Sequence, residues 1–323
     1  MKKFLLIILV LSFSYSSIAY TVNKNEFIQK GDFSCKINGQ ILFFEESSTD
    51  DETPLYTLRA IDIHTNKQML IANNLSCENC LKITDDVIAF TNGKKIICFN
   101  LKTKLKYDLL QADVGCYING IGIDSSGNRL LEIQVEYKKY RSLVKVINTK
   151  TKEKLFQQYI KLNQNEMEGI VPLIQTTDGL FIFSLQNKLF SISTSNKPEM
   201  KLISDKYDEY AINNTGVVFY KFVTDETTEG YYLNFQNWVT NKIDPSLNTK
   251  ISNCEKSFLI TATHQNNLVP YYIICGIPYG FSNYQWKVET NVLIYYDQQV
   301  EISLNRLGNN KIDKSKFTYK LLN

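Results

Sequence analysis

The chain has 323 residues, of which 44% are hydrophobic and 21% are charged, and its formal net charge is +3. This composition is typical of a globular protein and excludes a disordered, collagen-like or coiled-coil chain. The nearly neutral charge does not fit a nucleic-acid-binding domain, which usually has a basic face or stripe. With only two histidines, His64 and His264, a histidine-based catalytic or metal site is hard to assemble, and we expect neither a metal nor a cofactor.

Residues 1–19 have the pattern of a secretory signal peptide. Lys2 and Lys3 precede an apolar run from residue 4 to 13, and Ser17 and Ala19 then form a small-x-small cleavage site. The run is shorter than the ~20 residues that cross a bilayer, although an uncleaved anchor is the alternative. No later stretch is long and apolar enough to span a membrane. We therefore expect an exported protein, periplasmic or secreted, whose mature chain is one domain over residues 20–323.

The mature chain alternates short apolar runs with turns rich in Asn, Asp, Ser, Thr and Gly, which predicts many short antiparallel strands. Helical periodicity is nearly absent, and the best helical candidate is a short piece at Asn163–Gly169. The predicted strands include Ile41–Phe44, Val87–Phe90, Lys95–Phe99, Leu130–Val135, Leu143–Ile147, Leu180–Leu185, Lys188–Ile192, Val217–Phe222 and Tyr271–Cys275.

Two interleaved repeats indicate the architecture. The first is a polar turn followed by an apolar strand, and its equivalent positions are Gly39, Asp86, Gly127, Gly179, Gly216, Lys256 and Asn291. The second is a strand, a polar turn and another strand, with equivalent positions at Asp62, Asn100, Asn148 and Ser193. A common period of about 40–50 residues, with four strands in each unit, is typical of a propeller blade.

The repeats predict an all-β fold, a β-propeller of four-stranded antiparallel blades. Seven blades fit the period best, and six are the alternative because the repeat weakens after residue 276. A β-sandwich is the other all-β possibility, but it does not require a repeat. A last strand at Phe317–Leu322 is expected to pair with a strand from the N-terminal region, because an open ring would expose two sheet edges.

The units AIDIHTNKQML from Ala60 and VKVINTKTKEKL from Val144 resemble the blades of secreted β-propellers of the TolB, YVTN and quinoprotein-like kind. The resemblance covers residues 39–203. It implies a fold and no catalytic residues, because the tryptophan of quinoprotein blades, the sialidase Asp box and the Trp-Asp ending of WD40 repeats are absent.

Cys77 and Cys80 are the sharpest local motif. In an exported protein the pair predicts a disulfide in a loop between blades, and a redox-active pair is the alternative. Support for a zinc site is weak because the sequence has no second pair of cysteines with the same spacing. Cys254 and Cys275 are a second candidate disulfide. The seven cysteines are an odd number, so at least one is not paired within the chain.

An aromatic segment from Tyr271 to Trp286 is the candidate binding site. Proline and glycine predict a loop over Gly276–Asn283, and aromatic rings are common in binding hot spots. Packing between blades is the alternative role. The residues expected to contact a ligand or partner are Tyr279, Phe281, Tyr284 and Trp286.

Two charged segments were interpreted as solvated surface. Glu45–Glu52 predicts an acidic loop, with calcium binding as the weaker alternative. Lys138, Lys139 and Arg141 predict a basic hairpin tip.

The expected function is a binding or scaffold module for a protein or glycan partner, without nucleic-acid binding and more in keeping with a non-enzyme. The alternatives are a hydrolase or lyase that uses carboxylates and tyrosines at the channel mouth, and a redox role for Cys77 and Cys80.

Overall fold

A computed structural model describes most of the predicted domain. The described residues are 26–47, 55–78, 80–166, 172, 174–177, 179–206, 210–212, 216–224, 227–242, 257–264, 267–274, 285–289, 292–296, 298–305 and 315–322. Within these ranges, none of the helical segments has the length and hydropathy needed to cross a bilayer.

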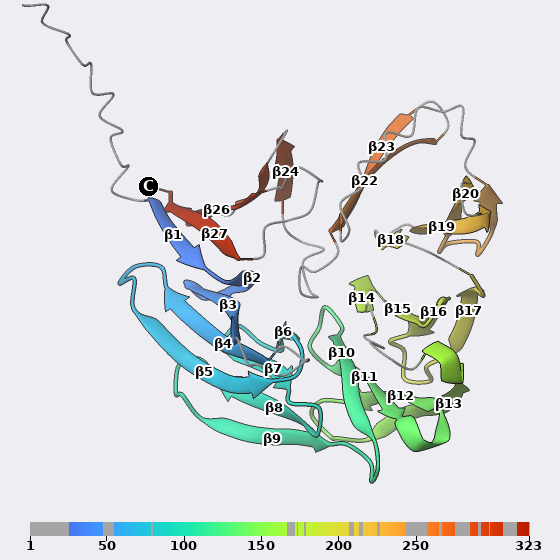
Figure 1. The fold of residues 1–323 in the computed structure, drawn as a ribbon, viewed down its shortest axis with the longest axis horizontal. Helices are drawn as coiled ribbons and strands as arrows, with labels where there is room; N and C mark the ends of the chain where they lie inside the picture. The colour runs from blue at the N-terminus through green and yellow to red at the C-terminus, as the bar shows by residue number, and fades with distance from the viewer. Residues whose placement is uncertain are drawn as a thin grey trace, which may run out of the picture.

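Antiparallel sheets are arranged in a ring, with the first strand of each sheet nearest the centre (Figure 1). Five sheets have four consecutive strands each. Blade 1 contains β2 (Asp32–Ile37), β3 (Gln40–Ser47), β4 (Leu55–Asp62) and β5 (Gln68–Leu75). Blade 2 contains β6 (Cys80–Lys82), β7 (Val87–Thr91), β8 (Lys95–Asn100) and β9 (Lys106–Gln111). Blade 3 contains β10 (Tyr117–Ile123), β11 (Arg129–Glu136), β12 (Arg141–Asn148) and β13 (Lys154–Lys161).

The ring continues with two further blades and a hairpin. Blade 4 contains β14 (Ile174–Thr177), β15 (Leu180–Leu185), β16 (Lys188–Ser193) and β17 (Met200–Ser204). Blade 5 contains β18 (Tyr210–Ile212), β19 (Gly216–Thr224), β20 (Thr227–Asn234) and β21 (Thr240–Lys242). The hairpin that follows pairs β22 (Ser257–His264) with β23 (Asn267–Ile274).

The closing sheet joins the two ends of the chain. It contains β24 (Gln285–Glu289), β25 (Val292–Tyr296), β26 (Val300–Asn305) and β27 (Lys316–Leu321), and β1 (Glu26–Lys30) is added as its fifth, outermost strand. β1 pairs antiparallel with β27 from Glu26 opposite Lys320 to Lys30 opposite Lys316. The predicted pairing of the last strand with the N-terminal region is therefore confirmed.

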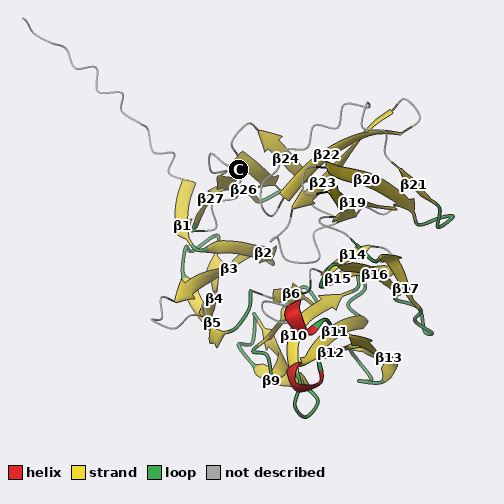
Figure 2. Ribbon diagram, turned by 45° about the vertical axis from the view of Figure 1, so that its right-hand side comes forward, coloured by secondary structure: helices red, strands yellow, loops and turns green. Residues whose placement is uncertain are grey.

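The propeller prediction is confirmed by six described sheets of four or five strands, and a β-sandwich is excluded. The seventh blade stays a prediction, because the hairpin β22–β23 has two described strands at that place in the chain. The predicted strands lie within strands of the structure, except that Cys275 lies outside the described residues and Leu322 lies one residue beyond β27. Figure 2 shows the helical content of the described part, two short 3-10 turns at Tyr137–Lys139 and Gln164–Glu166, the second inside the predicted helical piece.

The hydrophobic cores lie between neighbouring blades. Inner strands are buried on both faces, as in β2, whereas outer strands such as β13 are largely exposed. Blades 1 and 2 share a cluster that includes Phe44, Leu58, Ile88 and Phe90, and the closing sheet shares another with blade 1. Each blade therefore buries its two faces only against its neighbours, as expected for a repeat protein.

The two sequence repeats form turns on the same face of the ring, and within a blade these turns are hydrogen-bonded to each other. The first repeat is the hairpin between the first and second strands, and the second repeat is the turn between the third and fourth. A backbone amide of the second turn donates to a carbonyl of the first, from Ile63 to Gly39 at 2.9 Å, Leu101 to Asp86 at 2.7 Å, Thr149 to Asn128 at 3.0 Å and Thr194 to Gly179 at 2.9 Å. The two repeats have the same period because each blade contains one turn of each kind and the two turns are hydrogen-bonded to each other.

The second repeat is built on a side-chain oxygen that accepts hydrogen bonds from the turn that follows it. Asp62 Oδ1 accepts from the backbone N–H groups of His64 and Thr65, and four residues after Asp62 the chain adopts a left-handed conformation at Asn66, with φ 53°. Asn100 and Asn148 repeat this geometry. The structure adds a copy that sequence analysis missed at Asn234, which accepts from Gln236 at 2.7 Å and is followed by Trp238 at φ 57°.

Gly31 connects the closing sheet to blade 1. It is the single residue between β1 and β2, and its φ of +114° is one that side-chain-bearing residues rarely adopt. A Cβ at this position would lie 2.6 Å from the Phe44 carbonyl oxygen and 2.8 Å from the Phe43 ring. Glycine is therefore required here both for the backbone conformation and for the close approach of β3.

Candidate functional site

The face opposite the repeat turns carries the connections that differ between blades. Antiparallel order places the turn between the second and third strands on this face, together with each connection from one blade to the next. We call it the inter-blade face. Since rigid scaffolds usually carry binding residues on variable loops, a binding site is expected on this face.

Four exposed tyrosines gather at the inter-blade end of blade 3, and we call them the tyrosine surface: Tyr117, Tyr137, Tyr140 and Tyr159. Each is between 38% and 48% exposed. The rings of Tyr117 and Tyr137 meet edge to face with centroids 6.0 Å apart. The amide of Asn119 donates to the Tyr137 hydroxyl at 3.0 Å. These contacts hold the rings in place while leaving them accessible to a partner.

Cationic side chains border the tyrosine surface. The Arg141 guanidinium lies 3.9 Å from the centroid of the Tyr159 ring, a cation–π contact. Glu136 accepts from Arg141 at 2.6 Å and pairs with Lys139 at 2.7 Å, and the hydrogen bond from Lys139 is the main cause that lowers the pKa of Glu136. Lys138 is also exposed here. The predicted basic tip is thus confirmed, with aromatic rings around it that sequence analysis did not connect to it.

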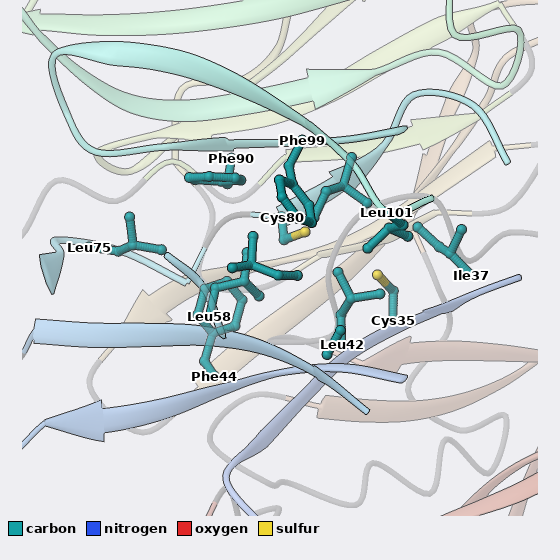
Figure 3. Packing of buried hydrophobic residues seen from close by; sticks show 13 residues of the cluster. Cys35, Ile37, Leu42, Phe44, Leu58, Leu75, Cys80, Phe90, Phe99 and Leu101 are labelled. Carbon is teal, nitrogen blue, oxygen red and sulfur yellow. The ribbon is translucent and has the colours of Figure 1, made fainter. Parts of the chain in front are cut away.

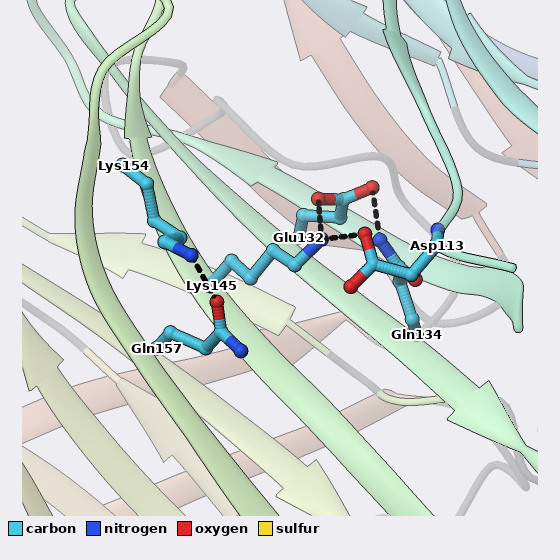
Figure 4. A network of polar contacts seen from close by, with 6 residues as sticks. All are labelled: Asp113, Glu132, Gln134, Lys145, Lys154 and Gln157. Atoms are coloured by element: carbon cyan, nitrogen blue, oxygen red, sulfur yellow. Dashed lines mark hydrogen bonds and ion pairs between the residues drawn. The ribbon is translucent and has the colours of Figure 1, made fainter.

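A buried polar network lies behind this end of blade 3, facing blade 2 (Figure 4). The side-chain amide N–H of Gln134 donates to the Glu132 carboxylate at 2.9 Å. The side-chain carbonyl oxygen of Gln134 accepts from the backbone N–H of Asp113, also at 2.9 Å. Lys145 Nζ donates to Asp113 at 2.5 Å and lies 3.8 Å from Glu132. The network holds the connection between β9 and β10 in place. Tyr117 is the first residue of β10, directly after this connection.

Glu132 is the unusual member of this network. Its side chain is 1% exposed, and burial raises its pKa to about 6, although Lys145 and the hydrogen bond from Gln134 act in the opposite direction. Desolvation dominates because the ammonium group of Lys145 is much closer to Asp113 than to Glu132. A buried carboxyl with this balance is a functional candidate or a structural device, and its position beneath the tyrosine surface, away from any described opening, favours the structural role.

A cleft at the joint of the ring is the second candidate site. It has a volume of about 570 Å³. Its lining includes several carboxylates, a tyrosine and the turn at Gly31. The lining residues are Lys30, Gly31, Asp32, Phe44, Glu45, Glu46, Tyr56, Glu78 and Ser315. Glu45 is engaged by Arg59 at 2.5 Å. Glu45 and Glu46 belong to strand β3, so the predicted acidic loop over Glu45–Glu52 is wrong at its start. Within the described residues, no three His, Cys, Asp or Glu side chains are grouped to hold a metal.

The predicted aromatic site lies mostly outside the described residues. This applies to Tyr279, Phe281 and Tyr284, and to the predicted loop over Gly276–Asn283. Trp286 lies in β24, where it is opposite Tyr295. Because β24 is the innermost strand of its sheet, in the same position as the first strand of the other blades, it begins at the inter-blade face. The role of these residues as a contact site stays a prediction.

The cysteines differ in their surroundings. Cys254 and Cys275 lie outside the described residues. The structure describes five cysteines: Cys35, Cys77, Cys80, Cys98 and Cys116. Cys77 lies in the connection between β5 and β6, whereas Cys80 opens β6 and is fully buried, so the expectation that both lie in a loop is wrong for Cys80. A disulfide or redox role for the pair stays a prediction.

Comparison with known proteins supports the fold alone. No protein-family model and no curated protein matches the sequence. The acylaminoacyl peptidase of Pyrococcus horikoshii matches with a TM-score of 0.50 at 12% identity, over 92% of this chain and 51% of the peptidase, so the chain spans about half of its length. The β-propeller domain of the Trilobed protease from Pyrococcus furiosus, described as having an open velcro topology, matches with a TM-score of 0.50 at 10% identity, over 91% of this chain and 94% of that domain.

The ring of antiparallel sheets and these structural matches define the chain as a β-propeller protein. TolB from Acinetobacter baumannii also matches, with a TM-score of 0.43 at 12% identity, over 90% of this chain and 65% of TolB. The fold conclusion rests on the blades themselves and on the two matches at 0.50. The predicted resemblance to secreted β-propellers is confirmed at the level of architecture.

Proposed function

We propose that the protein is an exported binding module that recognises a protein or glycan partner through the inter-blade face. The observation that carries this proposal is the tyrosine surface, where four partly exposed rings are held on a rigid blade. Tyrosine contributes a large contact area at a small entropic loss, and it is enriched in binding hot spots. Lys138, Lys139 and Arg141 exceed the single carboxylate of Glu136, so acidic groups on the partner are favoured.

The geometry explains why such a surface does not need catalytic residues. The repeat turns on the opposite face are hydrogen-bonded in the same way in several blades, so they maintain the scaffold. The inter-blade face varies from blade to blade and contains both the tyrosine surface and the beginning of β24. Trp286, which the sequence predicts as a contact residue, belongs to that strand, and this supports the choice of the inter-blade face.

The test compares two double variants in binding to proteins captured from the native exported fraction and to an array of acidic and neutral glycans. Tyr117→Ser with Tyr137→Ser should weaken binding about 10-fold or more, because each lost hot-spot ring typically removes more than 1 kcal/mol. The melting temperature should stay within about 2 °C of the wild type, since the rings are exposed. Leu70→Ser with Leu202→Ser, exposed on β5 and β17, is the matched control and should bind normally.

Equal loss of binding in both double variants, or none in either, would contradict the tyrosine surface as the site. A loss seen only with Tyr284→Ala and Trp286→Ala would move the site to the aromatic segment predicted from the sequence.

A hydrolase or lyase is the second candidate, favoured by the carboxylates and Tyr56 in the cleft at the ring joint. Turnover of a glycan or peptide that disappears in Glu46→Gln but persists in the tyrosine double variant would support this alternative.

A further inference from the structure

We propose that Cys35 and Cys80 form a disulfide that covalently joins the first and second blades. The proposal assigns Cys80 a partner 45 residues away in the chain, in place of its neighbour Cys77. It does not depend on the proposed binding function.

The two cysteines face each other across one blade interface. Cys35 is on β2 and Cys80 is on β6, the innermost strands of blades 1 and 2, which contact each other directly. Cys35 is 5% exposed and Cys80 is 0% exposed, and both belong to the same hydrophobic cluster (Figure 3). The thiols of Cys35 and Cys80 interact as hydrogen-bonding neighbours.

Inner strands of neighbouring blades approach each other closely in this propeller. At the interface of blades 3 and 4, a Cβ added to Gly122 on β10 would lie 2.7 Å from Ile174 on β14. At that interface the Ile174 side chain occupies the space next to Gly122, which has no side chain. The interface of blades 1 and 2 instead holds two short cysteine side chains, one from each inner strand, within one hydrophobic cluster.

Cys77 is in a different environment from Cys80. It is partly exposed in the connection that precedes β6, while the side chain of Cys80 lies in the cluster among Leu42, Leu58 and Cys35. Cys35 is a buried member of the same cluster as Cys80, whereas Cys77 is not among the buried members of that cluster. The geometry therefore favours Cys35 as the partner of Cys80.

The reaction is a thiol–disulfide exchange with a disulfide oxidant of the exported compartment. Cys35 and Cys80 each lose a proton, two electrons pass to the oxidant disulfide, one sulfur–sulfur bond forms between the blades, and the oxidant leaves as two thiols. Burial is the main cause that raises the pKa of the Cys80 thiol, and the interaction with Cys35 raises it further. Since the thiolate is the attacking species, the bond must form before blades 1 and 2 pack together. Afterwards it is shielded from reductants.

The bond would secure blade 1 on both sides. β1 and β27 already connect the closing sheet to the start of β2, and a core cluster that includes Phe33, Phe43 and Phe317 packs on that side. The disulfide would secure the opposite side, towards blade 2.

The experiment maps the disulfides in the full-length protein, either secreted into an oxidising compartment or refolded with glutathione disulfide. Unreacted thiols are alkylated under denaturing conditions before digestion with trypsin and a glutamate-specific protease. Trypsin releases residues 31–36, which contain Cys35, and residues 68–82, which contain both Cys77 and Cys80; cleavage after Glu78 then separates the last two. The expected product is residues 31–36 linked to residues 79–82, and it should persist in Cys77→Ser.

Stability supplies an independent readout. Reduction should lower the melting temperature by roughly 5–10 °C, because a cross-link that closes a loop of this length restricts the unfolded chain. Cys35→Ala and Cys80→Ala should abolish this response to reductant, each in a background where Cys254 and Cys275 are serine. Cys98→Ala, which removes an equally buried thiol on β8, should keep it. Complete alkylation of Cys35 without reductant, or a mapped Cys77–Cys80 bond, would overturn the proposal.

Discussion

At the scale of single residues, Glu132 shows how burial and charge compete in this propeller. Its carboxyl is buried against blade 2 with the amide of Gln134 at 2.9 Å, while Lys145 lies 3.8 Å away and is closer to Asp113. The ion pair therefore compensates the loss of hydration only in part, and the pKa is raised to about 6. Buried ion pairs are often no more stabilising than neutral replacements, and we expect the same of the Glu132 carboxylate.

The raised pKa of Glu132 predicts how the stability of the fold changes with pH. Because the folded state binds the Glu132 proton more tightly than the unfolded chain does, this group favours folding at acidic pH, and that contribution is lost as the pH rises from about 4.5 to about 6. Glu132→Gln keeps the shape without the titration. The variant should therefore gain up to about 2 kcal/mol relative to the wild type between pH 4 and pH 7, measured by urea unfolding at each pH. A difference between variant and wild type that does not change with pH would contradict this assignment.

At the scale of elements, the ring depends on one residue between two strands. β1 belongs to the closing sheet and β2 to blade 1, and Gly31 makes the turn between them at a φ of +114°. Its backbone N–H donates to the Ser315 carbonyl at 2.7 Å, just before β27 begins. The direction in which β1 leaves blade 1 is therefore fixed by a backbone conformation and a close contact together.

Gly31→Ala should lower the free energy of unfolding by about 2 kcal/mol or more, because it adds a steric clash with β3 to the backbone strain. Gly115→Ala is the matched control. Gly115 also has a positive φ, +79°, but nothing lies within 4 Å of an added Cβ, so only the strain of about 1 kcal/mol remains. Chemical denaturation of both variants provides the comparison, and equal losses would show that the close approach to Phe44 is unimportant.

At the scale of the whole molecule, the propeller is a chain of blade interfaces closed at one joint. Neighbouring blades elsewhere follow one another along the chain, whereas the closing sheet is held to blade 1 by the pairing of β1 with β27 and by side-chain packing. Phe317 is fully buried at this joint, with ring centroids 5.8 Å from Phe33 and 5.7 Å from Phe43. Closure also covers the edge of β27, which would otherwise be available to another chain.

Phe317→Ala should therefore have a consequence that other core substitutions lack. Phe181→Ala, between blades 3 and 4, removes an equally buried ring, and each variant should lose about 3–5 kcal/mol of stability. Only the Phe317 variant should form more dimer than the wild type as its concentration rises, because an opened joint lets β1 pair with β27 of a second chain. Light scattering coupled to size-exclusion chromatography measures this, and similar behaviour of the two variants would contradict the special role of the joint.

Sequence alone determined the class of fold, because a blade repeats both its strand pattern and its turns. Asp62, Asn100 and Asn148 were visible as equivalent positions, since each supplies the oxygen that its turn requires, and the last strand was correctly expected to meet the N-terminal region. The copy at Asn234 was missed because Gln236, Asn237 and Trp238 all differ from the residues at the equivalent positions after Asp62, Asn100 and Asn148. There, backbone geometry is repeated while composition is not.

Only the tertiary structure decided which residues meet. Tyr117 and Tyr137 are far apart in the chain, and their rings meet only because the strands of blade 3 bring both to the same face. Cys80 is adjacent to Cys77 in the motif, yet its sulfur points towards Cys35, because alternate residues of an inner strand face opposite neighbouring blades. A periodic sequence specifies the blade, but contacts between blades depend on the register and the packing angle of two sheets, which no local pattern contains.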